Sequence, residues 1–153
     1  MSAETDLIKL YSTQLLALAA DIPHTDRLEA PKATVKRRAP LCGSTVTVDL
    51  DLDDTGRIAR FGQDVKACAL GQAAAAIVGA HIIGRNRDEV QTARDALRNM
   101  LKTDGPVPGA PFERLELLRP AVAYKNRHDS ICLALEATLE AMDAVDSDQS
   151  VAR

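Results

Sequence analysis

The sequence predicts an α+β domain in which helices pack on one face of a small antiparallel sheet. Residues 45–52 alternate polar and apolar side chains with the period of two that is typical of a half-buried strand. Residues 53–56, Asp-Asp-Thr-Gly, have the chemistry of a turn, so residues 57–65 are predicted to return as the second strand of a hairpin. After residue 65 the apolar pattern changes to helical spacing, which predicts that helices follow the strands.

The elements before the hairpin are predicted to be a helix, a loop and a short strand. Apolar residues recur at spacings of three and four over residues 6–20, which indicates an amphipathic helix. Pro23 ends this helix, and the prolines and charged residues of 21–31 indicate a loop. A short strand is expected over residues 33–39.

Two helices are expected directly after the hairpin. Residues 67–83 are rich in alanine and nearly all apolar, which predicts a helix that is buried on most of its surface and ended by Gly84. Asn86 is expected to cap the next helix, which runs to about Lys102. Glu89, three residues after Asn86, completes the pattern of a capping box.

The last third of the chain is predicted to hold a loop and two further helices. Glycines and prolines make residues 103–111 the most loop-like stretch. A short helix is expected over 112–118, ended near Pro120, and a long one over 129–145, where apolar residues recur at spacings of four and three.

One domain over residues 1–145, with a frayed polar tail over 146–153, is the expected organisation of this 153-residue chain. The formal net charge of −3 gives no general reason to bind a nucleic-acid backbone. The basic run Lys36-Arg37-Arg38 suits instead an acidic protein partner.

No apolar run approaches the roughly 20 residues of a membrane span, and no basic segment precedes an apolar one at the N-terminus. We therefore expect a soluble, cytoplasmic protein with neither nucleic acid nor membrane as a partner.

Signatures of catalysis are missing from the sequence. There is no glycine-rich phosphate loop and no Ser/His/Asp signature, so we expect that the protein is not an enzyme. Four acidic residues, Asp49, Asp51, Asp53 and Asp54, lack the glycine and glutamate positions of a calcium-binding loop. The strand alternation is expected to place Asp49 and Asp51 on a solvated outer face.

The cysteines are the best candidates for chemistry. Cys42 lies between Pro40 and Gly43, whose irregular backbone indicates a thiol on a loop, either a ligand or nucleophile or a small loop filler. Cys68 lies at the predicted start of a helix, where unpaired N–H groups and the helix dipole favour a thiolate, although a packing role is as compatible with the sequence. Cys132 leaves an odd number of thiols in a chain without an export signal, which indicates free thiols rather than disulfides.

The three histidines differ in their surroundings. His24 in a loop and His81 on an apolar helix are expected to be structural. His128 opens the final helix, with Asp129 next to it and Cys132 four residues further on, and is therefore a candidate metal ligand.

The segments Pro40-Leu41-Cys42-Gly43 and Cys68-Ala69-Leu70-Gly71-Gln72-Ala73, taken with the order of elements, resemble the NifU N-terminal, IscU and SufU family of iron–sulfur cluster assembly scaffolds. The resemblance spans roughly residues 5–145. In that family a Pro-x-Cys-Gly-Asp loop supplies the first cysteine and an aspartate, a helix start supplies the second cysteine, and a third cysteine opens the last long helix. Cys42 and Cys68 match the first two positions.

The chain departs from the family pattern in two places. Ser44 stands where the family has the aspartate. In one alignment Ser130 takes the place of the third cysteine and Asp129 that of the residue which is histidine in the IscU type; Cys132 then falls about 200° round the helix, in the core. In the other alignment the helix start is shifted and Cys132 is the third ligand. Both alignments remain open on the sequence.

The resemblance implies a scaffold in which Cys42 and Cys68, with Asp129, His128 or Cys132 completing the site, hold Zn²⁺, Fe²⁺ or a transient Fe–S cluster. Soft thiolates with an oxygen or nitrogen ligand suit these groups. The implied partners are a cysteine desulfurase and the apo-proteins that receive the cluster, with the scaffold a monomer or a homodimer. Two alternatives are a zinc-dependent sulfur-transfer protein, in which Cys42 accepts persulfide sulfur from the desulfurase, and a degenerate scaffold that acts as an interaction module.

Overall fold

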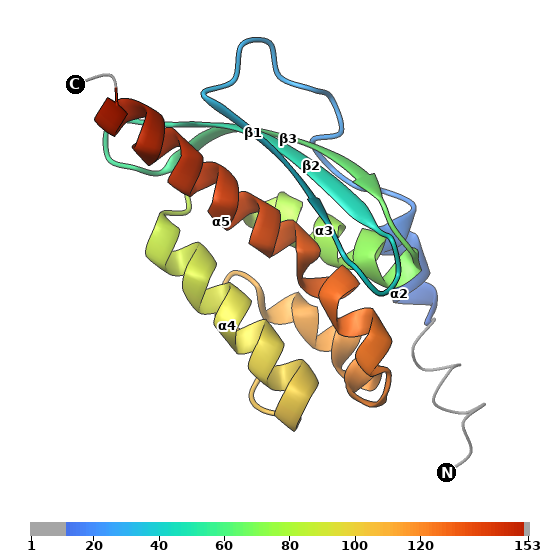
Figure 1. Cartoon of the computed structure of the whole chain (residues 1–153). Helices are drawn as coiled ribbons and strands as arrows, with labels where there is room; N and C mark the ends of the chain where they lie inside the picture. The colour runs from blue at the N-terminus through green and yellow to red at the C-terminus, as the bar shows by residue number, and fades with distance from the viewer. Residues whose placement is uncertain (1–11, 152–153) are drawn as a thin grey trace.

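The computed structural model of the chain describes residues 12–151 and has the predicted α+β architecture (Figure 1). Strands come early in the chain and most of the helices follow them. The elements are α2 (Thr13–Ala19), β1 (Ala33–Arg38), β2 (Thr45–Leu52), β3 (Ile58–Lys66), α3 (Ala69–His81), α4 (Arg87–Thr103), the 3₁₀ helices η1 (Glu113–Ala123) and η2 (Lys125–Arg127), and α5 (His128–Val151).

The three strands form one antiparallel sheet in the order β1-β2-β3. At its centre Val48 of β2 lies opposite Val35 of β1 and Gln63 of β3. The inward side chains of β2 are buried because α5 crosses this face of the sheet, with α3 and α4 packed against α5 (Figure 1). The prediction of helices on one face of a small antiparallel sheet is confirmed. No helix in residues 12–151 combines the length and the apolar character that a membrane crossing requires.

The hairpin and the helix caps lie where the sequence predicts them. Strand β2 spans the predicted residues 45–52, and its turn leads into β3. The capping box of α4 is complete, since the Glu89 N–H donates to Asn86 Oδ1 at 2.8 Å and the Asn86 N–H donates to Glu89 Oε1 at 3.0 Å. Local chemistry decides these features, which explains why the sequence reveals them.

Two predicted elements differ from the structure by more than two residues at one end, and a third lies partly outside the described residues. Part of the first helix, predicted over 6–20, lies outside the described residues, and the described part ends at Ala19. The helix predicted over 112–118 is instead the 3₁₀ helix η1, which continues through Pro120 to Ala123. Helix α5 continues to Val151 rather than ending at residue 145, because no glycine or proline follows to stop it and each further residue adds a hydrogen bond.

The prediction of a solvated outer face on β2 is wrong. Asp49 is fully buried, because the segment between α2 and β1 covers this face. Arg27 donates to both carboxylate oxygens of Asp49, at 2.6 and 3.0 Å, and the Leu28 N–H and the Thr34 hydroxyl donate to it at 3.1 and 2.7 Å. Asp51 is partly exposed and is bonded to Arg60 and to the backbone N–H of Lys32.

Candidate functional site

The turn that joins β1 to β2 presents the first cysteine. The Gly43 N–H donates to Ala39 O at 2.9 Å, and the Ala39 N–H donates to Ser44 O at 2.8 Å, so the turn is closed by its own backbone. Gly43 has a φ of +70°, a conformation that suits glycine and aims the turn outward. Cys42 is half-buried, and its thiol donates to the carbonyl of Asn126 at 3.1 Å. The predicted loop position of Cys42 is confirmed.

The second cysteine lies at the start of α3, as the sequence predicts. Cys68 is the N-cap residue and is half-buried. Burial acts to raise the pKa of its thiol, but hydrogen bonds from the Gly71 and Leu70 N–H groups and the Ser130 hydroxyl, with the charge of Arg127, outweigh burial and lower this pKa. The helix start therefore favours the thiolate, which is the form that binds metal and attacks sulfur.

The third contributor is the first turn of α5. Ser130 is 1% exposed, and its hydroxyl lies within hydrogen-bond distance of the Ser44 hydroxyl, at 2.9 Å. The same oxygen lies 3.6 Å from the Cys68 sulfur. A Cβ on Gly71 would lie 2.6 Å from Ser130 Oγ, so the glycine is what lets α3 approach α5 this closely. Cys42, two residues before Ser44, belongs to the same cluster of elements.

The other predicted ligands lie on a different side of α5. Cys132 is buried at 5% exposure, and burial, followed by the charge of Glu136, raises the pKa of its thiol to about 12. Cys132 and Asp129 line a cavity between α5, α4 and the end of β1, and so does His128, whose Nε2 lies 2.9 Å from the carbonyl of Ala121. Cys132 lies two positions after Ser130 on the helix, so their side chains point about 200° apart.

The structure thus brings the Cys68 thiol together with the hydroxyls of Ser130 and Ser44, and the Cys42 thiol lies two residues before Ser44 on the same turn. Residues 12–151 contain no group of three or more His, Cys, Asp or Glu side chains placed to hold one metal ion. The contributions of the Asn126 carbonyl and of Arg127 were missed by sequence reasoning, because neither leaves a local signal. Gly71 does leave one, since an isolated glycine within a helix pattern often marks a close approach. His24, edge-on to Phe61 at 6.1 Å, and the exposed His81 lie elsewhere.

The comparison with solved structures decides the family. The chain is 35% identical to the crystal structure of a nitrogen-fixing NifU-like protein (N-terminal) from Brucella abortus, with a TM-score of 0.89 over 93% of this chain and 98% of that one. The chain belongs to the NifU-like N-terminal family. The resemblance predicted from the segments around Cys42 and Cys68 is therefore confirmed.

A second solved structure has a fold similar to that of this NifU-like chain. An iron–sulfur cluster assembly scaffold protein for the SUF system from Fervidobacterium islandicum AW-1 superposes with a TM-score of 0.78 at 17% identity, over 88% of this chain and 98% of that one. At this identity the likeness concerns the fold alone. No family model and no curated protein matches the NifU-like sequence.

Proposed function

We propose that this NifU-like chain is a scaffold in iron–sulfur cluster assembly, which holds iron, zinc or a transient cluster as cargo and passes it to apo-proteins. The observation that carries the proposal is that Ser130 contacts both Ser44, on the turn that holds Cys42, and Cys68 at the helix start, where the thiolate is favoured. Thiolates are the ligands that zinc and Fe–S clusters prefer. The protein acts in this role as a carrier rather than as an enzyme.

The cargo would be held by two protein thiolates, those of Cys42 and Cys68. Zinc and the irons of Fe–S clusters take four ligands in tetrahedral sites. The hydroxyls of Ser44 and Ser130 already bond to each other, so they are weak candidates for the other positions. Inorganic sulfide or a thiolate of the donor or recipient protein would fill those positions, a coordination that suits a cargo held only for transfer. The three free thiols fit a reducing compartment such as the cytoplasm.

Metal loading should depend on Cys42 and Cys68 and not on Cys132. Protein purified anaerobically as wild type, Cys42→Ser, Cys68→Ser and Cys132→Ser would be analysed for iron, zinc and acid-labile sulfide. We expect loading to be lost in the first two variants, because each removes one of two thiolates, and to persist in Cys132→Ser. Circular dichroism of each variant controls for unfolding. Equal loading in all four proteins would contradict the scaffold proposal, and loss in a folded Cys132→Ser would make Cys132 a ligand.

A second candidate function, sulfur transfer, is favoured by the accessibility of Cys42. The thiol sits on an outward turn beside Leu41, which is 71% exposed, so a partner's persulfide can reach it. In this step the Cys42 thiolate attacks the outer sulfur of a cysteine desulfurase persulfide. The S–S bond breaks, the desulfurase cysteine leaves as a thiolate, and the outer sulfur stays on Cys42 as a new persulfide, so no oxidant is consumed.

Mass spectrometry after incubation with a cysteine desulfurase and free cysteine tests sulfur transfer. We expect a mass increase of one sulfur atom on the Cys42 peptide, because this is the thiol that the turn exposes. Cys68→Ser should still accept the sulfur, whereas Cys42→Ser should not. Reductant should remove the added mass, since a persulfide is reducible. An unmodified Cys42 peptide beside an active desulfurase would rule out this second function.

A further inference from the structure

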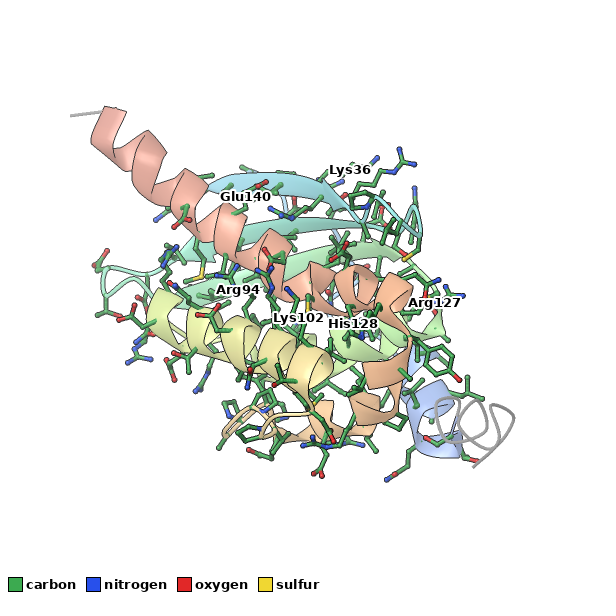
Figure 2. The ribbon with its side chains drawn as sticks, turned by 60° about the horizontal axis from the view of Figure 1, so that its bottom comes forward. Lys36, Arg94, Lys102, Arg127, His128 and Glu140 are labelled. Atoms are coloured by element: carbon green, nitrogen blue, oxygen red, sulfur yellow. The ribbon has the colours of Figure 1, made fainter. Side chains whose placement is uncertain are left out.

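A cavity of about 260 Å³ lies on the side of α5 that faces away from Ser130. Its walls come from the end of β1, the last turns of α4 and the first turns of α5. Four cations line it, Arg37 and Arg38 from β1 and Arg98 and Lys102 from α4, against two carboxylates of α5. Figure 2 labels Lys102 of α4 and His128 of α5, which both line the cavity.

One of the two carboxylates is already neutralised by arginines. Glu136 forms ion pairs with Arg94 at 3.1 Å, Arg98 at 3.5 Å and Arg37 at 3.7 Å. Its side chain is only 16% exposed, so these pairs act in a partly desolvated setting where the attraction is stronger than in water. The ion pairs within the fold therefore neutralise the charge of Glu136, so this carboxylate does not repel an incoming anion.

Two of the lining cations remain available. Within residues 12–151, Arg38 and Lys102 make no ion pair and no side-chain hydrogen bond, and both are exposed. Asp129 is the one lining carboxylate that no cation of the described chain contacts. The cavity thus carries a local excess of positive charge in a chain whose net charge is −3. Charge complementarity indicates an anionic occupant.

Part of the cavity wall is apolar. Pro40, Leu101 and Leu133 line it together with Cys132, whose thiol has a pKa raised to about 12 by burial and so stays neutral at physiological pH. An apolar wall beside unpaired cations matches a glutamate side chain, which has a methylene stem and a carboxylate end. Small-molecule pockets usually enclose about 300–1,000 Å³, so this smaller cavity fits one or two side chains of a larger partner better than a free ligand.

The cavity also adjoins the turn that holds Cys42. Pro40 precedes Cys42 by two residues, and Asp129 precedes Ser130 directly. The Arg38 guanidinium lies beside Gly43, since a Cβ on that glycine would be 3.8 Å from Arg38 Nη2. A partner held at the cavity would consequently lie against the Cys42 turn.

We propose that this cavity binds the carboxylate side chains of an acidic segment of a partner protein, with Arg38 and Lys102 as the recognising cations. The inference goes beyond the proposed function, because it concerns a surface that needs neither metal nor sulfur to act. The unpaired Asp129 carboxylate argues against a polyphosphate chain as the occupant, since a regular row of phosphates cannot avoid it, whereas a peptide places its charges singly.

The test is the binding of a fluorescein-labelled hexaglutamate peptide to the full chain, followed by fluorescence anisotropy at low ionic strength. We expect Lys102→Glu and Arg38→Glu each to weaken binding by about tenfold, because each replaces a charge-assisted contact with repulsion. The matched control is Arg114→Glu, which makes the same change of charge on η1 at another exposed position away from the cavity. It should change the affinity by less than about twofold, the range of a distant surface charge.

Three results would overturn the proposal. The first is no binding to the wild type at low ionic strength. The second is equal weakening in Lys102→Glu and Arg114→Glu, which would mean that the peptide responds only to net charge. The third is displacement of the labelled peptide by citrate at concentrations far below those at which unlabelled hexaglutamate displaces it, with citrate binding lost in the same variants, which would identify a small polycarboxylate as the ligand. Thermal unfolding of each variant confirms that it is folded.

Discussion

Replacing Ser130 with cysteine is expected to raise the affinity of the chain for Zn²⁺ about 100-fold, a change of roughly 2.8 kcal/mol in binding free energy. The Ser130 oxygen lies 3.6 Å from the Cys68 sulfur, so a thiol in its place would be within reach of a metal bound to Cys68. The substitution is close to isosteric and keeps the residue in the first turn of α5. It turns a site with two thiolates into a site with three, the usual minimum for protein-bound zinc.

The gain would be measured by competition with a chromophoric zinc chelator and by the visible spectrum of the Co²⁺ form. Ser130→Ala is the matched control, since it removes the hydroxyl and adds no ligand, and it should leave the affinity near that of the wild type. The gain should vanish when Cys68→Ser is combined with Ser130→Cys. An affinity that does not rise in a folded Ser130→Cys protein would mean that position 130 cannot reach the metal.

Replacing Asp49 with alanine is expected to lower the free energy of unfolding by about 3 kcal/mol, near the lower end of what breaking a buried ion pair costs. The substitution leaves the Leu28 N–H and the Thr34 hydroxyl without their shared acceptor. Arg27 is 54% exposed and can turn to water, which limits the loss. Urea denaturation followed by circular dichroism would measure it. Asp64→Ala on β3 is the control, since that half-exposed carboxylate makes a 4.0 Å pair with Lys66 and acts on Arg27 through charge alone.

The same carboxylate predicts a pH dependence. Burial acts to raise the pKa of Asp49, but the hydrogen bonds from Arg27, Thr34 and Leu28, with the Arg27 charge, lower this pKa below its ordinary value of 3.8. Its contribution to stability is therefore complete above pH 3.8 and is lost as the pH falls through the lowered folded-state pKa. Asp49→Ala should lose less stability than the wild type over this acidic range. Parallel losses in the two proteins would contradict the assignment.

Features fixed by neighbouring residues could be predicted from the sequence. The alternation of residues 45–52, the Asn86 capping box and the placement of Cys68 at a helix start depend on chemistry within a few positions, and the structure has all three. The Cys42 turn belongs to the same group, since Pro40 and Gly43 decide it locally.

Features fixed by distant contacts could not be predicted. The alternation of β2 predicts that Asp49 points away from the helices. Only the fold shows that the segment between α2 and β1, which carries Arg27, covers that face. The rotation of α5 about its axis decides whether Ser130 or Cys132 lies beside Cys68, and this rotation depends on packing against α3 and the sheet. The sequence around residue 130 permits either, which is why both alignments remained open.

The hydrogen bond between Ser44 and Ser130 joins positions 86 residues apart, and the contact of Ser130 with Cys68 spans 62 residues. Contacts of such long sequence separation form late in folding, because the chain must lose the entropy of closing large loops before they stabilise anything. A nascent or partly folded chain consequently cannot gather the two cysteines with their neighbours. The contacts of Ser130 with Ser44 and Cys68 exist only once α5 has docked, so a fragment that ends before residue 128 should lack them altogether.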